Sequence, residues 1–354
     1  MLIVLHGNPN LLPMKLIYFN GGPEEKAMLH KALPDVTVEV VEDQLNSETI
    51  QLARDAQIIS AYVFAPIDTK ALAQMPELEM IATRSAGHDH IDLATCRQRG
   101  IVVSNVPNYG ERTVAEHTFA VILALSRRMV PSLQRTEKMN FDRAGLTGFD
   151  LSGKTLGVIG MGNIGKNVAR IGHCFEMRIL AYDQVHDDDF ATAHGVTYVT
   201  AVEELLERSD IITLHLPYTK ATHHTINRDN VTKVKRGALL INTARGGLVD
   251  TQALLWGLNE GLISGAGLDV LEEEKDAFDR IEFMSRKSPS YEELATLLRN
   301  HLLVARDDVL ITPHNAFNST EAVQRIFDTT VLNIQAYLAS NPINEVTTTA
   351  ARNT

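Results

Sequence analysis

Short hydrophobic runs of strand length alternate with segments of helical periodicity along almost the whole chain. The runs are nearly continuous stretches of Val, Ile and Leu, a pattern typical of parallel strands that are buried on both faces. They fall into an earlier and a later series, which predicts the α/β fold class with two mostly parallel sheets, each flanked by helices. The predicted strands are Lys15–Phe19, Val36–Val41, Ile58–Ala61, Met80–Thr83, Val102–Ser104, Thr155–Ile159, Ile179–Tyr182, Ile211–Leu214, Ala238–Asn242, Gly265–Leu268 and Val309–Thr312.

The segment Glu111–Arg128 has a helical pattern whose middle is hydrophobic almost all round. Such a helix has no broad polar face, so it must be buried between layers of the fold or in a subunit interface. We expect it to build a homodimer. A loop rich in Gly and Asp follows this helix, and a further helical pattern covers Tyr291 to Arg299.

Length, charge and cysteine content narrow the class of protein. The 354 residues are too many for one ordinary core and indicate roughly two domains. Lys and Arg number 33 against 44 Asp and Glu, and the net charge of -11 disfavours nucleic acid and anionic membranes as partners, but not a small anionic substrate. The two cysteines are too few for a disulfide framework, and no apolar run reaches the roughly 18 residues of a membrane span. We therefore expect a cytoplasmic protein.

Two groups of possible metal ligands occur in the sequence. His88 and His90 form an H-x-H pair, but neither a cysteine nor a third clustered ligand accompanies them. The triplet Asp187–Asp189 has the pattern of a solvated loop. We expect no metal site.

A glycine-rich loop joins a predicted strand to a predicted helix. The strand Thr155–Ile159 runs into the sequence GMGNIG at residues 160–165, and a helical pattern follows from Lys166. In this context Gly160 permits a tight turn, Gly162 lets the backbone approach a pyrophosphate, and Gly165 lets the helix pack on the strand. The helix N-terminus adds unpaired N–H groups and a partial positive charge. The loop therefore predicts a Rossmann-type dinucleotide-binding domain.

Charged side chains follow three strands of the later series. Arg245 comes after Ala238–Asn242, Asp269 comes directly after Leu268, and His314 comes after the strand that ends at Thr312. The carboxyl ends of strands in an open α/β sheet face the ligand crevice. One edge of the sheet is thus expected to present a guanidinium, a carboxylate and an imidazole.

The chain resembles the D-isomer-specific 2-hydroxyacid dehydrogenases over roughly residues 14–345. Seven motifs occur in the order that the family shows. They are RSAGHDHID (84–92), NVPNY (105–109), AEHT (115–118), GMGNIG (160–165), NTARG (242–246), GLDV (267–270) and TPH (312–314). The aromatic Tyr109 and the long segment between Glu274 and His314 are most similar to the D-lactate dehydrogenase branch.

The resemblance implies a catalytic set of Arg245, Glu274 and His314. Arg245 would bind the substrate carboxylate, which its planar fork suits, and polarise the keto oxygen. His314 would protonate that oxygen, and Glu274 would hydrogen-bond the histidine and favour its protonated form. Lys275 stands where the family commonly has a proline, and a shift of register would move the role of Glu274 to Glu272 or Glu273.

The resemblance also implies the remaining contacts. The backbone N–H groups of Ala86 and Gly87 would bind the substrate carboxylate, and Tyr109 would form an aromatic wall. Asp269 would lie beside the nicotinamide carboxamide. The implied cofactor contacts are Gly160, Gly162, Asn163, Ile164, Gly165, Asp183, Leu216, Pro217, Thr222, Thr243, Ala244, Arg245 and Asp269.

Two domains are implied, one inserted into the other. Residues 14–108 and 316–354 would form a flavodoxin-like substrate (catalytic) domain, and residues 109–315 the NAD-binding Rossmann domain. Two crossings at one hinge would let the domains close over the substrate. We expect residues 1–13 to be an extension that is dispensable.

The implied function is an NAD-dependent D-2-hydroxyacid dehydrogenase that reversibly reduces pyruvate to D-lactate, with hydride from NADH and a proton from His314. A first alternative is a reductase of another 2-oxo acid, such as hydroxypyruvate, glyoxylate or a branched 2-oxo acid. A second is an NAD(H)-sensing binding protein like the co-repressors that share this fold. The lack of basic tails favours the enzyme.

Asp183 ends the strand that follows the glycine loop, where a carboxylate can bind both ribose hydroxyls and would repel a 2′-phosphate. We therefore predict NAD as the cofactor in preference to NADP. The substitution Asp183→Ala should weaken NADH relative to NADPH, as measured by the Michaelis constants for both. Unchanged constants would contradict the ribose role.

Overall fold

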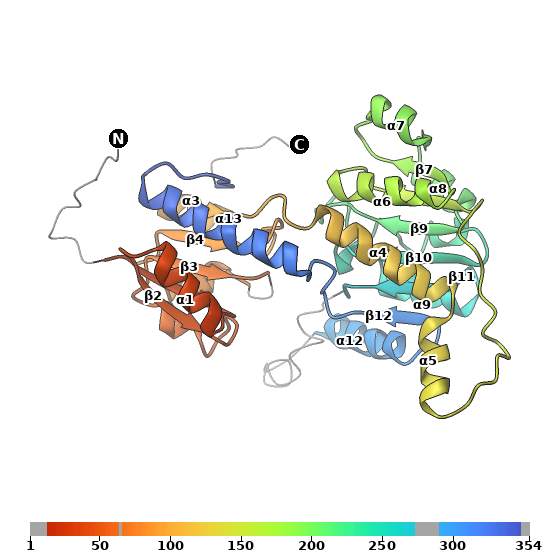
Figure 1. Cartoon of the computed structure of the whole chain (residues 1–354), viewed down its shortest axis with the longest axis horizontal. Coiled ribbons are helices and arrows are strands. Elements are labelled where there is room, and N and C mark those ends of the chain that lie inside the picture. The colour runs from red at the N-terminus through yellow and green to blue at the C-terminus, as the bar shows by residue number, and fades with distance from the viewer. Residues whose placement is uncertain (1–12, 64–65, 273–289, 348–354) are drawn as a thin grey trace. The chain divides into compact units, whose positions relative to one another are not determined.

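The computed structural model describes residues 13–63, 66–272 and 290–347, and the structural statements below concern these ranges. The chain divides into two compact units. The smaller comprises the residues up to Tyr109 together with those from Thr320 onward, and the larger runs from Gly110 to Ser319 (Figure 1). The chain returns to the smaller unit between Ser319 and Thr320, slightly later than the predicted return at Ala316.

The smaller unit holds a five-stranded parallel sheet in the order β2-β1-β3-β4-β5. This is the flavodoxin-like order, in which the first strand lies between the second and the third. Its elements are β1 (Lys15–Phe19), α1 (Pro23–Ala32), β2 (Thr37–Val41), η1 (Ile50–Ala53), β3 (Ile58–Ala61), α2 (Thr69–Ala73), β4 (Met80–Thr83), α3 (Leu93–Arg99), β5 (Val102–Ser104) and α13 (Thr320–Leu338).

Helices cover both faces of this sheet. On one face Leu29 of α1 packs with Phe327 and Ile334 of α13. On the other face Leu72 of α2 and Cys96 of α3 belong to a second hydrophobic cluster. Because each strand is covered on both sides, its residues are hydrophobic almost without interruption.

The helix α13 is fixed to the smaller unit by a buried amide. The Nδ2 group of Asn333 donates to the carbonyl oxygen of Asn105 at 2.8 Å, and its Oδ1 atom accepts from Nδ2 of Asn344 at 2.9 Å. The segment after α13 then reaches the edge strand β5, where the N–H of Val346 donates to the carbonyl of Val103. Residues far apart in the sequence thus complete one unit.

The larger unit holds a seven-stranded parallel sheet in the order β12-β11-β10-β9-β6-β7-β8. From β6 the chain moves outward to β7 and β8, then returns to β9 on the other side of β6, which is the doubly wound dinucleotide-binding arrangement. Its elements are α4 (Glu111–Ser126), α5 (Met129–Glu137), β6 (Thr155–Ile159), α6 (Asn163–Cys174), β7 (Arg178–Tyr182), α7 (Asp188–His194), β8 (Val196–Tyr198), α8 (Val202–Arg208), β9 (Ile211–Leu214), η2 (Val231–Lys233), β10 (Ala238–Asn242), η3 (Gly246–Leu248), α9 (Thr251–Asn259), β11 (Ile263–Leu268), α12 (Tyr291–Val304) and β12 (Val309–Ile311).

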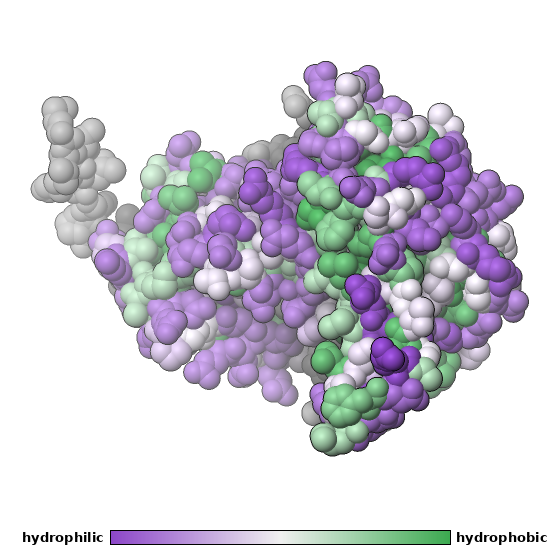
Figure 2. Space-filling model, turned by 45° about the vertical axis from the view of Figure 1, so that its right-hand side comes forward, coloured by the Kyte–Doolittle hydropathy of each residue, from purple (hydrophilic) through white to green (hydrophobic). Residues whose placement is uncertain are grey.

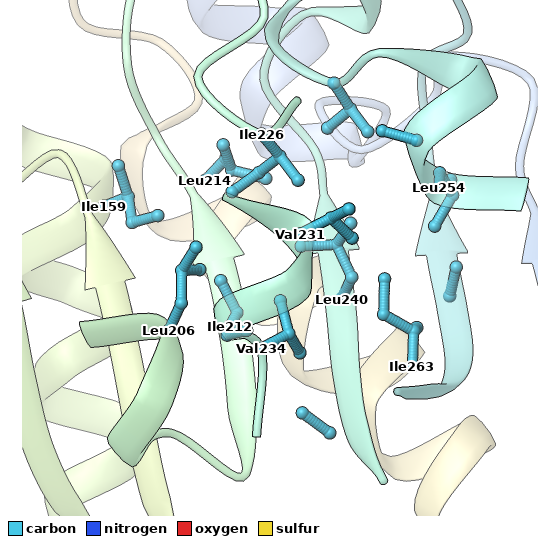
Figure 3. Packing of buried hydrophobic residues seen from close by; sticks show 14 of the residues in the cluster. Ile159, Leu206, Ile212, Leu214, Ile226, Val231, Val234, Leu240, Leu254 and Ile263 are labelled. Carbon is cyan, nitrogen blue, oxygen red and sulfur yellow. The ribbon is translucent and has the colours of Figure 1, made fainter. Parts of the chain in front are cut away.

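Two hydrophobic clusters lie on the two faces of the larger sheet. Figure 3 shows one of them, in which Leu206 of α8, Val231 of η2 and Leu254 of α9 pack around Ile212 and Leu240 of the central strands. The helices α4 and α6 supply the other cluster. These helices cover both faces of the sheet, so the loops at its carboxyl edge start from fixed positions.

The helix α4 approaches β11 closely because Gly267 has no side chain. A Cβ atom at Gly267 would overlap Cγ1 of Val121, and it would lie 3.2 Å from Cδ1 of Leu125. The predicted apolar helix is therefore packed on the sheet of its own unit over part of its length. It ends at Ser126, two residues before the predicted end.

The predicted fold class is confirmed, and every predicted strand is present with small changes at its ends. The strand β8 was not predicted, since it is a three-residue edge strand in which only Val196 is buried. The predicted solvated loop at Asp187–Asp189 is instead the exposed start of α7, because Asp187 caps that helix by accepting from the N–H of Phe190 and Asp188 and Asp189 form its first turn. No helix of the described ranges is both long and apolar enough to cross a membrane.

Candidate active site and cofactor site

The glycine loop lies where the order of the strands reverses. The strands β6 and β9 are neighbours, and the chain leaves them in opposite directions, which opens a crevice at their carboxyl ends. Gly160 has a φ of +98°, and a Cβ atom there would lie 2.7 Å from the carbonyl carbon and oxygen of His215. Only glycine satisfies both the left-handed backbone and this close approach.

The N-terminus of α6 is open for an anion. A Cβ atom at Gly162 would have no neighbour within 4 Å, and no side chain caps the helix. The first-turn N–H groups of Asn163, Ile164 and Gly165 have no intrahelical acceptor, as in any helix. A Cβ atom at Gly165 would overlap the carbonyl oxygen of Gly160, so this glycine seats the helix against the loop. The arrangement fits a pyrophosphate.

Asp183 is held beside the glycine loop. Its Oδ2 atom accepts from the N–H of Met161 at 2.6 Å, and its Oδ1 atom accepts from the N–H of Val185 at 3.1 Å. The carboxylate is half-buried, and each oxygen retains capacity for a further donor. These residues together fit a dinucleotide whose ribose carries free hydroxyls.

The other predicted cofactor contacts follow β9 and β10. Leu216 lies beside Gly160, since its N–H nitrogen would be 3.0 Å from a Cβ atom there. The hydroxyl of Thr222 donates to the carbonyl of Pro217 at 2.6 Å and closes a turn. Thr243 forms a buried hydrogen bond of 2.9 Å with Thr118 of α4.

Arg245 lies in a turn after β10 that Asn242 stabilises. The side chain of Asn242 donates to the carbonyl of Arg245 at 2.8 Å and accepts from the N–H of Ala244 at 3.1 Å. A Cβ atom at Gly246 would overlap the carbonyl group of Leu271, so the turn lies directly against the segment after β11. Arg245 is half-buried, and its Nη1 atom donates to the carbonyl of Ala244 at 2.8 Å.

Asp269 is buried, with 1% of its surface exposed, and its carboxylate holds the segment after β12. Its oxygens accept from the hydroxyl of Thr312 at 2.5 Å and from the N–H groups of Asn315 at 3.0 Å and Ala316 at 2.8 Å. Asp269, the residue predicted to contact the nicotinamide, therefore has a structural role, because it fixes the segment that carries His314.

His314 is set within this segment in an unusual backbone conformation. Its φ is +51°, a left-handed value that is uncommon for residues other than glycine. Its N–H donates to the carbonyl of Asp269 at 2.9 Å, and the N–H of Asp269 donates to the carbonyl of Asn242 at 2.9 Å. The ends of β10, β11 and β12 are thus linked, and Arg245 and His314 lie at the same edge of the sheet.

The predicted catalytic residue Glu274 lies outside the described residues, and so does Glu273. Glu272 is described, and its carboxylate binds two other loops. It lies 2.6 Å from Nε2 of His224 and accepts from the hydroxyl of Thr251 at 2.7 Å. These bonds give Glu272 partners other than a catalytic histidine.

In the smaller unit, Ala86 and Gly87 form a loop after β4 whose carbonyl groups are already paired. The carbonyl of Ala86 accepts from Nδ2 of Asn105 at 2.8 Å, and that of Gly87 accepts from the hydroxyl of Ser85 at 2.7 Å. In the described part of the chain, the N–H groups of both residues donate to no protein acceptor. Two successive N–H groups without a protein acceptor are available to bind an anion, and we call this pair of groups the nest of Ala86 and Gly87. Tyr109, at the end of this unit, is half-buried.

Sequence reasoning missed several residues around the site. Nε2 of His117 lies 3.2 Å from the hydroxyl of Thr312 and 3.6 Å from Oδ1 of Asp269, so α4 supports the segment that carries His314. His215 is half-buried beside Gly160, and desolvation lowers its pKa to about 3, so its ring is neutral. The periodicity of α4, which puts His117 and Thr118 toward the sheet, was the available signal.

In the described part of the chain, His88 and His90 are not joined by a third side chain that could ligate a metal ion. His90 is buried and lies 3.5 Å from the hydroxyl of Thr83. Within the described ranges, no group of three or more His, Cys, Asp or Glu side chains is arranged to hold a metal ion.

Residues 119–316 match the family described as "D-isomer specific 2-hydroxyacid dehydrogenase, NAD binding domain". A glyoxylate reductase of Thermofilum pendens is 36% identical over 322 residues, which cover 89% of this chain and 89% of the relative.

Two solved structures are similar over almost their full length. D-lactate dehydrogenase from Aquifex aeolicus, complexed with NAD and lactic acid, has a TM-score of 0.84 at 36% identity and covers 95% of this chain and 100% of its own. The pyruvate reductase of Chlamydomonas reinhardtii has a TM-score of 0.82 at 34% identity and covers 94% of this chain and 98% of its own.

The fold and the glycine loop define a two-domain α/β oxidoreductase that binds NAD. The sequence matches identify the family to which this oxidoreductase belongs. The chain belongs to the family of D-isomer-specific 2-hydroxyacid dehydrogenases, and it is an NAD-dependent enzyme of that family.

The open space at Gly162 leads to a prediction on cofactor binding. The substitution Gly162→Ala adds a methyl group that meets no protein atom, so the thermal midpoint without cofactor should not change. The methyl group lies where the pyrophosphate must approach α6, so the dissociation constant for NADH should rise about tenfold or more, a loss of about 1.4 kcal/mol. Fluorescence titration with NADH measures it.

The matched control is Gly267→Ala in the same unit. Its methyl group overlaps Val121, so it should lower the free energy of unfolding by about 1–3 kcal/mol and leave NADH binding by the folded protein near wild type. A Gly162→Ala variant that binds NADH as the wild type does would refute the proposed approach of the pyrophosphate.

Proposed function

We propose that this enzyme reversibly reduces pyruvate to D-lactate. The observation that carries the proposal is the common position of Arg245 and His314, at linked strand ends on the edge that also carries the glycine loop. A cation for the substrate carboxylate, a proton donor and a dinucleotide are the parts that reduction of a 2-oxo acid requires. Bound NADH supplies the hydride to C2 of the substrate.

Arg245 binds the substrate carboxylate and polarises the keto oxygen. A guanidinium suits this task because its donors form a planar fork that pairs with a carboxylate in bidentate fashion. The Asn242 bonds to the Arg245 turn fix the start of this side chain, so less conformational entropy is lost when substrate binds. In the smaller unit, the N–H groups of Ala86 and Gly87 bind the same carboxylate, and Tyr109 forms an aromatic wall.

His314 donates the proton that the reaction consumes. As the C2 carbonyl becomes an alkoxide, its oxygen takes the proton from the imidazolium, and the histidine is left neutral. In the reverse direction the neutral ring removes the hydroxyl proton. Glu274, which lies outside the described residues, is the proposed partner that orients the ring. The bonds that Asp269 makes to Thr312, Asn315 and Ala316 support the backbone of His314.

The choice of pyruvate draws on the solved relatives, a D-lactate dehydrogenase and a pyruvate reductase. A second candidate substrate is glyoxylate, which the name of the Thermofilum pendens relative favours. Glyoxylate lacks the methyl group of pyruvate, so the two substrates compete for the same carboxylate and carbonyl contacts. The ratio of kcat/KM for pyruvate and glyoxylate, measured with NADH, decides between them.

Substitutions at the two proposed catalytic positions should differ in effect. Arg245→Ala should nearly abolish activity, since it removes both substrate binding and polarisation. His314→Ala should lower kcat about 10²–10⁴-fold, the usual contribution of a general acid, while NADH still binds. Loss of NADH absorbance with pyruvate gives the rates. Wild-type turnover by His314→Ala would show that the proton comes from another group.

We also propose that the enzyme is a homodimer built on the C-terminal part of α4 and on the segment after it. The exposed hydrophobic side chains there include Leu133 at 55%, Met139 at 79% and Phe141 at 71% exposure. A groove of about 290 Å³ beside α5 is lined by Val130, Leu310 and neighbouring residues. Figure 2 shows hydrophobic surface at the lower end of the larger unit, where Figure 1 has α5. Hydrophobic patches of this kind mark interaction sites.

Light scattering at micromolar concentration should therefore give the mass of two chains. Leu133→Asp should give monomers, because a charge would be buried in the interface. Leu298→Asp places the same charge on the exposed face of α12, where Leu298 is 67% exposed, and should leave the dimer intact. A monomeric wild-type protein, or dissociation by Leu298→Asp alone, would overturn this assignment.

A further inference from the structure

Arg84 is the largest fully buried side chain of the described residues, with 1% of its surface exposed. It follows β4 in the smaller unit, whose sheet places β4 beside β3 and β3 beside β1 (Figure 1). The proposed function gives Arg84 no task. A fully buried arginine is rare unless a counter-charge accompanies it.

Two tyrosine rings and two carbonyl groups surround the guanidinium of Arg84. Its central carbon lies 4.0 Å from the ring centre of Tyr18 and 3.9 Å from that of Tyr62, so the planar group is in cation–π contact with both. Its terminal nitrogens donate to the carbonyls of Phe19 and Asn20 at the end of β1. Its Nε atom is buried and has no hydrogen-bond partner in the described residues.

The positive charge of Arg84 has no counter-charge among the described residues. No carboxylate of these ranges lies within ion-pair distance of the guanidinium. Burial raises the pKa of Tyr18, so its phenol stays neutral and cannot serve as a counter-ion. The carboxylate of Glu25, on the nearby helix α1, accepts from the N–H of Gly22 at 2.9 Å and caps that helix. The guanidinium is therefore buried in a site of low dielectric constant and has no ion-pair partner among the described residues.

The nest of Ala86 and Gly87 begins two residues after Arg84. Two residues span at most about 7 Å of extended chain, so the backbone of Arg84 lies within that distance of the first residue of the nest. The side chain of Arg84 also ties the end of β4 to the end of β1, which fixes where the nest begins. A carboxylate held by the two N–H groups would be the counter-charge that the buried guanidinium lacks.

We propose that Arg84 is a positioning and electrostatic residue for the substrate carboxylate. It acts through the nest and does not touch the substrate. Its buried charge raises the affinity of the nest for anions, while its stacking between Tyr18 and Tyr62 keeps the charge in place. This inference rests on the proposed function, in which the nest binds the carboxylate of a 2-oxo acid.

Substitutions that remove or keep the charge test the proposal. Arg84→Met should raise the KM for pyruvate and the dissociation constant of oxamate, an unreactive carboxylate analogue, about tenfold. That factor is expected when one charge on the order of 10 Å away is removed at an effective dielectric constant of about 20. The dissociation constant of NADH, which binds to the larger unit, should not change. Arg84→Lys keeps the charge and should retain most of the oxamate affinity.

A second pair of variants leaves Arg84 in place. A change in their oxamate affinity therefore cannot come from misfolding caused by the loss of Arg84. Tyr62→Glu would set a carboxylate beside the guanidinium and neutralise its charge. The variant Tyr62→Gln introduces a neutral side chain of the same shape as glutamate and is the matched control. Oxamate affinity should fall about tenfold in Tyr62→Glu relative to Tyr62→Gln. If Arg84 were merely structural, the new ion pair would hold it at least as well, and the two variants would bind oxamate alike.

Arg99→Met is the control for losing an arginine of the same unit whose guanidinium also bonds backbone carbonyls, although Arg99 itself is exposed. Arg99 also lies in the smaller unit and donates to the carbonyls of Leu72 and Met75, but it belongs to α3. Its loss should lower the thermal midpoint without changing oxamate binding. The inference is overturned if Arg84→Met binds oxamate as the wild type does, if Arg84→Met and Arg84→Lys weaken it equally, or if the Tyr62 pair does not differ.

The outcome for Arg84 can be told apart from that for the proposed function. If Arg245→Ala retains activity, the proposed function fails whatever the Arg84 variants do. If Arg245→Ala is inactive while the Arg84 and Tyr62 variants keep the wild-type oxamate affinity, the function stands and only the role of Arg84 is refuted.

Discussion

The arrangement of the strand ends in the larger unit depends on the hydrogen bonds of one buried carboxylate, that of Asp269. A carboxylate with 1% exposure is stable only when its oxygens are fully hydrogen-bonded, and here the hydroxyl of Thr312 and two backbone N–H groups satisfy them. All three donors belong to one short segment, so their bonds define its path. The left-handed backbone of His314 is held between them, which is how a strained conformation persists at a functional site.

Close backbone approaches supply the second constraint. Gly160 lies against the carbonyl of His215, and Gly246 lies against that of Leu271, so both the cofactor crevice and the arginine turn are made where two loops touch without an intervening side chain. Hydrogen bonds from Asn242 complete the turn, and Glu272 joins the loop of His224 to the start of α9. The chemistry is thus carried by a few side chains, but their positions are set by backbone contacts.

The strand pattern was enough to predict the α/β class, both parallel sheets and nearly all strand positions, because strands buried on both faces are hydrophobic without interruption. The edge strand β8 escaped because an edge strand needs little burial. In the site, position after a strand end and motif spacing selected Arg245, Asp269 and His314. The supports were not predictable in this way, since Thr118, His117 and Glu272 make contacts across loops and helices that no local pattern encodes. Arg84 stood in a recognised motif, yet its burial between two tyrosines depends on strands that pair only in the folded sheet.

The helix α13 completes the core of the smaller unit, although it is made after nearly everything else. Phe327, Val331 and Ile334 belong to the cluster on one face of the first sheet, and Asn333 ties the helix to the carbonyl of Asn105. During synthesis on the ribosome, the five strands of that sheet emerge early with this face uncovered. The larger unit is continuous in sequence and can close its own core first. The nascent chain must therefore keep an exposed apolar sheet from associating with other chains until its last helix arrives, and this interval is where chaperones would have most to protect.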